Sequence, residues 1–338
     1  MEPYLFSGAG INKIWQIFIN HRQNISFVNS RQKAFLGSLS ALLMLLAAAG
    51  HVLSPPAEAD DGRMSVVATF YPLYYFSGQI GGDRVRVEAL VPFNSEPHAW
   101  EPRPADIVNV DKCCVFVYNG ADLEPWVGKF LGTLRNRNSM QVVEATAGLP
   151  LGKEAGHGLN PHVWIDPVLA KMQVDNILAG FVQADPADTA YYAGNAENLK
   201  SRLDALDLEY RDGLANRTQN AIVTTHEGFD YLAERYNFSA YSVLGLSPNQ
   251  QPGAGKIADI VKVVEEHDLT VVFGEPVYSD RYMQTIANEV KRQSGRDIKV
   301  LILDGLHGKA GPHANLDYFQ IQRENLRNLQ IGLGANPA

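Results

Sequence analysis

The stretch DTAYYAGNAENLKSRLDALDLEYRDGL, residues 188–214, decides the fold of this chain. It contains no proline, and its apolar side chains recur at helical spacing along one stripe: Leu199, Leu203, Leu206, Tyr210 and Leu214. A helix over these 27 residues would extend for about 40 Å, which is the width of a domain. The sequence therefore predicts one long, rigid helix in the middle of the chain.

Short β-branched runs alternate with helical patterns on both sides of this helix. Before it we expect strands at 65–70, 85–91, 114–118 and 140–143, and helices at 71–81, 104–110, 124–134 and 168–184. After it we expect strands at 221–225, 239–244, 270–274 and 300–303, and helices at 229–236, 256–268 and 278–295. Such alternation indicates βαβ units on mostly parallel sheets. The prediction is an α/β fold with an N-terminal lobe over 60–186, a linking helix within 187–217 and a C-terminal lobe over 218–338.

The first 59 residues have the pattern of a leader with a signal peptide. Arg31 and Lys33 precede an uncharged run from Ala34 to Gly50, and an A-x-A site ends at Ala59. We expect cleavage after Ala59 and export of the remaining chain. The alternative is an uncleaved N-terminal anchor, although the run is at the short end of the range for a membrane span.

Composition restricts the partners of the exported chain. With 46% hydrophobic and 20% charged residues, the 338-residue protein is globular, and its net charge of −8 argues against a nucleic-acid partner. Only Cys113 and Cys114 are present, adjacent to each other in an apolar run, and we expect both to be small buried residues. A zinc site built from thiolates is therefore excluded.

Three histidines lie in segments whose backbone proline or glycine restricts, namely EPHAWEP (96–102), NPHVWIDP (160–167) and THEGF (225–229). Any one of His98, His162 and His226 alone is more often a satisfied core or surface residue, but all three together indicate a metal site. In open α/β sheets, ligands bind beyond the carboxyl ends of strands. His98 and His226 follow predicted strands, and Asp304 ends the strand at 300–303. These three imidazoles and one carboxylate would complete a tetrahedral zinc shell in the cleft between the lobes.

The remaining histidines are predicted to be solvated. His21 and His51 belong to the leader, His267 lies on a helix surface, and His307 and His313 lie in a glycine-rich loop, with His307 a minor candidate for the metal. Glu275, before Pro276 at a strand end, is the reserve carboxylate. Its alternative role is to support a ligand or to form a salt bridge.

The segments EPHAWEP, NPHVWIDP and THEGFDYLAERY, together with FGEPVYSD and LILDGL, resemble the metal-receptor family of ABC importers for zinc and manganese, from about Ser65 to Leu333. The resemblance implies a periplasmic solute-binding protein with two lobes, a long connecting helix and one metal in the cleft. It places the ligands at His98, His162, His226 and Asp304. Manganese members carry glutamate where His226 stands, which favours Zn²⁺ here. One departure is Gly305, where the family usually has proline.

We therefore predict a monomeric, non-enzymatic protein that captures one Zn²⁺ in the periplasm with high affinity and delivers it to the membrane permease of an ABC importer. One alternative is a manganese or iron receptor of the same family. A zinc hydrolase is a weaker alternative, because the sequence lacks HExxH, G-x-S-x-G and Walker A motifs. A surface adhesin is a third.

Overall fold

The computed structural model describes residues 62–154, 158–246 and 251–335. The predicted leader, with its cleavage site at Ala59, lies outside these residues. Among the described residues, no helix has both the length and the apolar character that crossing a membrane requires.

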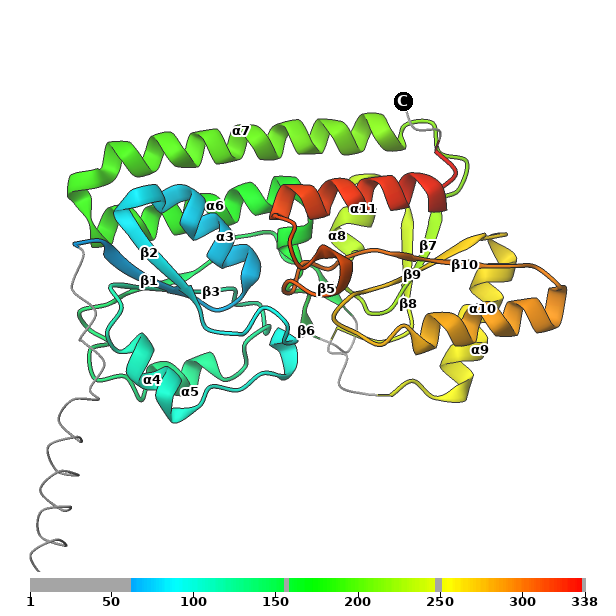
Figure 1. The fold of residues 1–338 in the computed structure, drawn as a ribbon, viewed down its shortest axis with the longest axis horizontal. Helices are drawn as coiled ribbons and strands as arrows, with labels where there is room; N and C mark the ends of the chain where they lie inside the picture. The colour runs from blue at the N-terminus through cyan, green and yellow to red at the C-terminus, as the bar shows by residue number, and fades with distance from the viewer. Residues whose placement is uncertain (1–61, 155–157, 247–250, 336–338) are drawn as a thin grey trace, which may run out of the picture. The chain divides into compact units, whose positions relative to one another are not determined.

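Two parallel sheets of four strands each form the framework (Figure 1). The first contains β1 (Met64–Ala68), β2 (Val85–Ala89), β3 (Val115–Tyr118) and β4 (Gln141–Glu144), in the order β2-β1-β3-β4. The second contains β7 (Ala221–Thr224), β8 (Ser239–Ser242), β9 (Val271–Gly274) and β10 (Lys299–Ile302), in the order β10-β9-β7-β8. Counted within each sheet, both have the order 2-1-3-4, whose switch point lies between the first and third strands. The predicted α/β fold with mostly parallel sheets is confirmed.

The helices begin and end close to the predicted positions. They are α3 (Tyr71–Gly81), α4 (Pro104–Val110), α5 (Val127–Leu131), α6 (Pro167–Ala184), α7 (Thr189–Leu214), α8 (Asp230–Arg235), α9 (Ala254–Glu266), α10 (Arg281–Ser294) and α11 (Tyr318–Gly332). Proline in the first turn of α3, α4 and α6 suits positions whose N–H has no helical partner.

The sequence reading assigned no element after residue 303 and therefore missed α11. This helix begins with a capping box between Asp317 and Gln320, and buries residues at helical spacing: Tyr318, Phe319, Ile321, Gln322, Asn325, Leu326, Leu329 and Gly332. The pattern is thus present in the sequence. A short hairpin of β5 (Lys153–Glu154) and β6 (Gly158–Leu159) was also missed.

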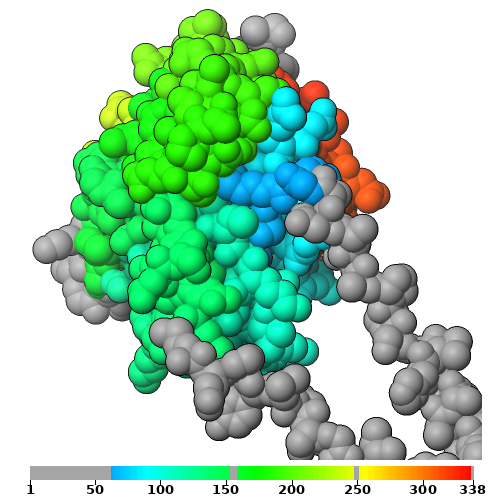
Figure 2. Space-filling view, turned by 90° about the vertical axis from the view of Figure 1, so that its left-hand side faces the viewer, coloured from blue at the N-terminus to red at the C-terminus, as the bar shows by residue number. Residues whose placement is uncertain are grey.

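Helix α7 is the predicted long helix, and it extends past both sheets (Figure 1). Its stripe of Leu199, Leu203, Leu206, Tyr210 and Leu214 is at most 2% exposed. It packs on α3 and α6 at the first sheet and on α11 at the second, and Figure 2 shows it over the upper part of the N-terminal face. The residue bounds given above for the two lobes and the linking region remain predictions.

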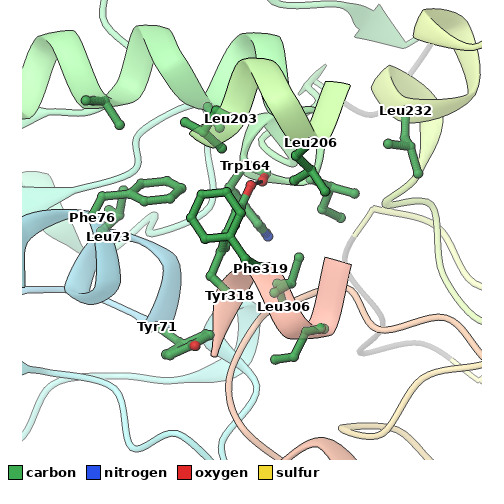
Figure 3. Close-up of a cluster of buried hydrophobic side chains, with 14 of the residues drawn as sticks. Tyr71, Leu73, Phe76, Trp164, Leu203, Leu206, Leu232, Leu306, Tyr318 and Phe319 are labelled. Carbon is green, nitrogen blue, oxygen red and sulfur yellow. Dashed lines mark hydrogen bonds between the residues drawn. The ribbon is translucent and has the colours of Figure 1, made fainter. Parts of the chain in front are cut away.

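One hydrophobic cluster draws on both sheet regions (Figure 3). It contains side chains of α3, α7, α8 and α11, among them Phe76, Leu206 and Phe319, and also Trp164 and Leu306 from loops. The ring of Trp164 lies edge-on to Phe70, with centroids 4.6 Å apart. The shared core fixes the loops that follow strands of both sheets relative to one another, and these loops carry the histidines.

The prediction for the cysteines is confirmed only for Cys113, which is buried. Cys114 is exposed, because it lies on the other side of the chain just before β3.

Candidate metal centre

His98 lies in a short 3₁₀ helix, Pro97–Ala99, in the segment after β2. The Glu96 carboxylate caps this turn, since its oxygens accept the backbone N–H groups of His98 at 3.0 Å and Ala99 at 2.9 Å. Pro97 fixes the backbone on the other side of the cap. The imidazole of His98 is therefore presented from a restrained backbone.

His162 is completely buried and precedes the 3₁₀ turn Val163–Ile165. Asn160 Oδ1 lies 3.0 Å from its backbone nitrogen and 2.9 Å from ring Nδ1. The Asn160 amide nitrogen donates to Asp230 at 3.1 Å, so the oxygen must face His162. Nδ1 therefore carries the proton and donates to Asn160, which leaves the lone pair of His162 on Nε2.

His226 follows β7, and Glu275 follows the neighbouring strand β9, so the two meet at the switch point of the second sheet. Glu275 Oε1 lies 2.6 Å from His226 Nδ1 and also accepts the backbone N–H of His226 at 3.2 Å. His226 Nδ1 is thus the donor, and its Nε2 carries the lone pair. A carboxylate behind the imidazole is a common support for a metal ligand.

His307 comes from the loop after β10 and is 1% exposed. Among the residues that the structure describes, neither of its ring nitrogens has a hydrogen-bond partner, and neither has Glu275 Oε2. Gly305 makes room for this ring, because a Cβ at that position would lie 2.7 Å from Glu275 Oε2 and 2.7 Å from two atoms of His307. Buried polar atoms without partners are costly, and a cation would satisfy them.

The four imidazoles converge on one point. His162 Nε2 lies 3.1 Å from Nε2 of His98 and 3.1 Å from Nε2 of His226. One ligand atom from each of these rings and from His307 lies within 4.8 Å of the others. Lone pairs that face each other at this distance repel unless a cation lies between them. A tetrahedral zinc ion with Zn–N bonds of about 2.0–2.1 Å would hold its nitrogens about 3.3 Å apart, so the spacing fits.

Burial keeps these imidazoles neutral, as ligation requires. It lowers the pKa of His98 to about 3, with His226 a smaller cause. Burial, followed by neighbouring histidines, also lowers the pKa of His162 and His307 well below the ordinary value. Burial raises the pKa of Glu275, an effect that the adjacent His226 opposes.

Three of the four predicted ligands thus come together, and Asp304 lies outside the group. Its carboxylate is used elsewhere, because Oδ1 accepts the backbone N–H of Leu306 at 2.8 Å and Oδ2 lies 2.9 Å from His313 Nδ1. The prediction that His307 and His313 are solvated is wrong, since they are only 1% and 6% exposed. The signal for His307 was the one that marked His226, a histidine in a glycine-containing segment just after a strand.

Fold and site together define the class: an α/β protein with two parallel sheets, a long helix across them and a buried imidazole site able to hold one metal ion. The family described as periplasmic zinc-uptake complex component A (ZnuA) matches residues 66–332. The chain belongs to this family.

Individual relatives agree. The chain is 33% identical over 311 residues to the high-affinity zinc uptake system protein ZnuA of Bacillus subtilis, covering 87% of this chain and 96% of that protein. It is 30% identical to the zinc-binding lipoprotein AdcA of Streptococcus pneumoniae, but there the match covers 86% of this chain and only 60% of the relative. The crystal structure of the Zn(II)-bound ZnuA-like domain of that AdcA superposes with a TM-score of 0.69 at 30% identity, covering 80% of this chain and 99% of the domain.

Proposed function

We propose that this protein captures one Zn²⁺ per chain in the periplasm and delivers it to the membrane permease of an ABC importer. Its proposed ligands are His98, His162, His226 and His307, the last in the place predicted for Asp304. The observation that carries the proposal is the convergence of four imidazoles with unshared lone pairs. Membership of the zinc-uptake family supports the role in transport.

The donor set favours zinc over manganese. Imidazole nitrogens suit zinc, whereas manganese is bound by carboxylate, carbonyl and water oxygens. Four imidazoles in a tetrahedral shell leave no open position for a water to be activated, and catalytic zinc sites keep such a position. We therefore propose a binding protein that works as a monomer and has no enzymatic activity.

Equilibrium titration of the purified mature chain with Zn²⁺ tests this function, with a chelator to set the free concentration. We expect one zinc per chain, bound much more tightly than Mn²⁺ or Fe²⁺, and no hydrolysis of generic ester or peptide substrates. The His267→Ala variant is the matched control, because His267 is exposed at the end of α9 and should not affect binding. Absence of zinc binding, or a preference for manganese, would contradict the proposal.

The third ligand also tests metal selectivity. Replacing His226 by glutamate exchanges a nitrogen donor for an oxygen donor and should shift the preference toward manganese. If the ratio of zinc to manganese affinity stayed that of the parent, the donor set would not be what selects the metal.

The periplasmic location depends on the leader. We expect N-terminal sequencing of the native protein to begin near Asp60, and elemental analysis of protein from the periplasm to find about one zinc per chain. A native chain that retains residues 34–50 would indicate an anchor instead.

A further inference from the structure

We propose that Asp304 and His313 form a positioning pair that holds the turn 304–307 and so presents His307 to the metal. This inference rests on the proposed function, and it assigns a task to a buried histidine outside the ligand group. Asp304 Oδ1 accepts the N–H of Leu306 at 2.8 Å, which closes the turn from inside. Asp304 Oδ2 lies 2.9 Å from Nδ1 of His313, which holds the carboxylate from outside.

The backbone of Asp304 is also fixed. Asn325 on α11 accepts the N–H of Asp304 at 2.7 Å and donates to its carbonyl oxygen at 2.8 Å. The next carbonyl, that of Gly305, accepts the indole N–H of Trp164 at 2.8 Å. The start of the turn is therefore held by α11 and by the loop that carries His162.

The turn needs this support because its conformation is strained. Leu306 has φ of 58°, in the left-handed region that residues with a Cβ rarely adopt. Its side chain is completely buried in the core shared by α3, α7 and α11 (Figure 3). The core thus holds Leu306 from one side, and the bond to Asp304 stabilises the unusual backbone that follows. His307 is the next residue, so the direction of its ring depends on this backbone.

His313 is suited to the outer half of the pair. It lies in the 3₁₀ turn Gly311–His313, is 6% exposed, and its Nδ1 faces the carboxylate rather than the metal ligands. A hydrogen bond from this ring fixes Asp304 Oδ2 and leaves Oδ1 for Leu306. The shortage of free oxygens is also what separates Asp304 from a ligand role.

Four variants of the full mature chain test the pair, with zinc affinity and the visible absorption of the Co²⁺-loaded protein as readouts. His313→Ala and Asp304→Ala should each weaken zinc binding by about tenfold or more, the lower end for an outer partner. Both should also change the Co²⁺ spectrum, because His307 leaves its place. His313→Asn should restore affinity and spectrum, since its amide N–H can donate to Asp304 Oδ2. Asp304→Asn should stay near the parent, because its amide oxygen still accepts the N–H of Leu306.

The outcomes separate the alternatives. If Asp304→Asn lost as much affinity as Asp304→Ala, Asp304 would be a ligand and the positioning role would be overturned. Parent-like zinc binding and spectra in both alanine variants would overturn it as well, and so would a His313→Asn variant as weak as His313→Ala. Should the alanine variants not fold, as seen by circular dichroism without metal, the two asparagine variants decide. A parent chain that binds no zinc would overturn the proposed function itself, whereas the results above require a parent that binds.

Discussion

His162 and His226 are both completely buried, and each has a partner at Nδ1, but the partners differ in charge and in origin. His162 is oriented by the neutral amide of Asn160, two residues earlier in the chain, at 2.9 Å. His226 is oriented by the carboxylate of Glu275, 49 residues away on the neighbouring strand, at 2.6 Å. The N-terminal half of the site is therefore built by local sequence, and the C-terminal half by the order of strands in a sheet.

The largest effect should come from removing either ligand. His162→Ala and His226→Ala should each weaken zinc binding by more than about 100-fold, because loss of an outer partner alone costs about 10–100-fold. Chelator competition measures this, and circular dichroism should show the fold retained, since both residues lie in loops. A variant that binds zinc like the parent would remove that residue from the ligand set.

A smaller effect should come from the two partners, and it should be unequal. Glu275→Ala should weaken zinc binding by about 10–100-fold, because an anion behind the imidazole raises its basicity as well as fixing its ring. Asn160→Ala should cost less, since only orientation is lost. Glu275→Gln keeps an acceptor without the charge and should fall between Glu275→Ala and the parent. Equal losses for Asn160→Ala and Glu275→Ala would show that charge plays no part.

The frame of the N-terminal half includes a buried carboxylate that gives a pH-dependent test. Glu124 accepts the hydroxyl of Thr69 at 2.6 Å and the backbone N–H groups of Asn119 at 2.9 Å and Gly120 at 3.0 Å. The Asn119 side chain in turn donates to the carbonyl of Pro161, next to His162, at 3.1 Å. Burial raises the pKa of Glu124 to about 7, against the opposing effect of these hydrogen bonds.

Because the raised pKa belongs to the folded state, folding takes up a proton between about pH 4.5 and 7. The stability from this group is complete below pH 4.5 and is lost as the pH rises to about 7. The free energy of unfolding of the parent should therefore fall relative to Glu124→Gln, by at most about 1.4 kcal/mol per pH unit. Urea unfolding of both proteins between pH 4.5 and 8 measures the difference. Parallel curves would show that Glu124 is ionised in the fold throughout this range.

The same comparison explains what could be predicted from the sequence. His98 and His162 could be found because proline restrains their segments within a few residues, and His226 because it follows an evident strand. His307 could not be chosen over Asp304, because its place depends on contacts distant in sequence. These are the left-handed backbone of Leu306 and the bonds from Asn325, on a helix that the reading missed. A carboxylate at a strand end resembled a ligand, but its oxygens hold a turn.

A crystal structure of the zinc-loaded protein tests the central claim most directly. We predict one zinc ion bonded to four imidazole nitrogens at about 2.0–2.1 Å, from His98, His162, His226 and His307, with the carboxylate of Asp304 still bonded to the N–H of Leu306. A zinc ion bonded to an oxygen of Asp304, or a shell without His307, would contradict the account.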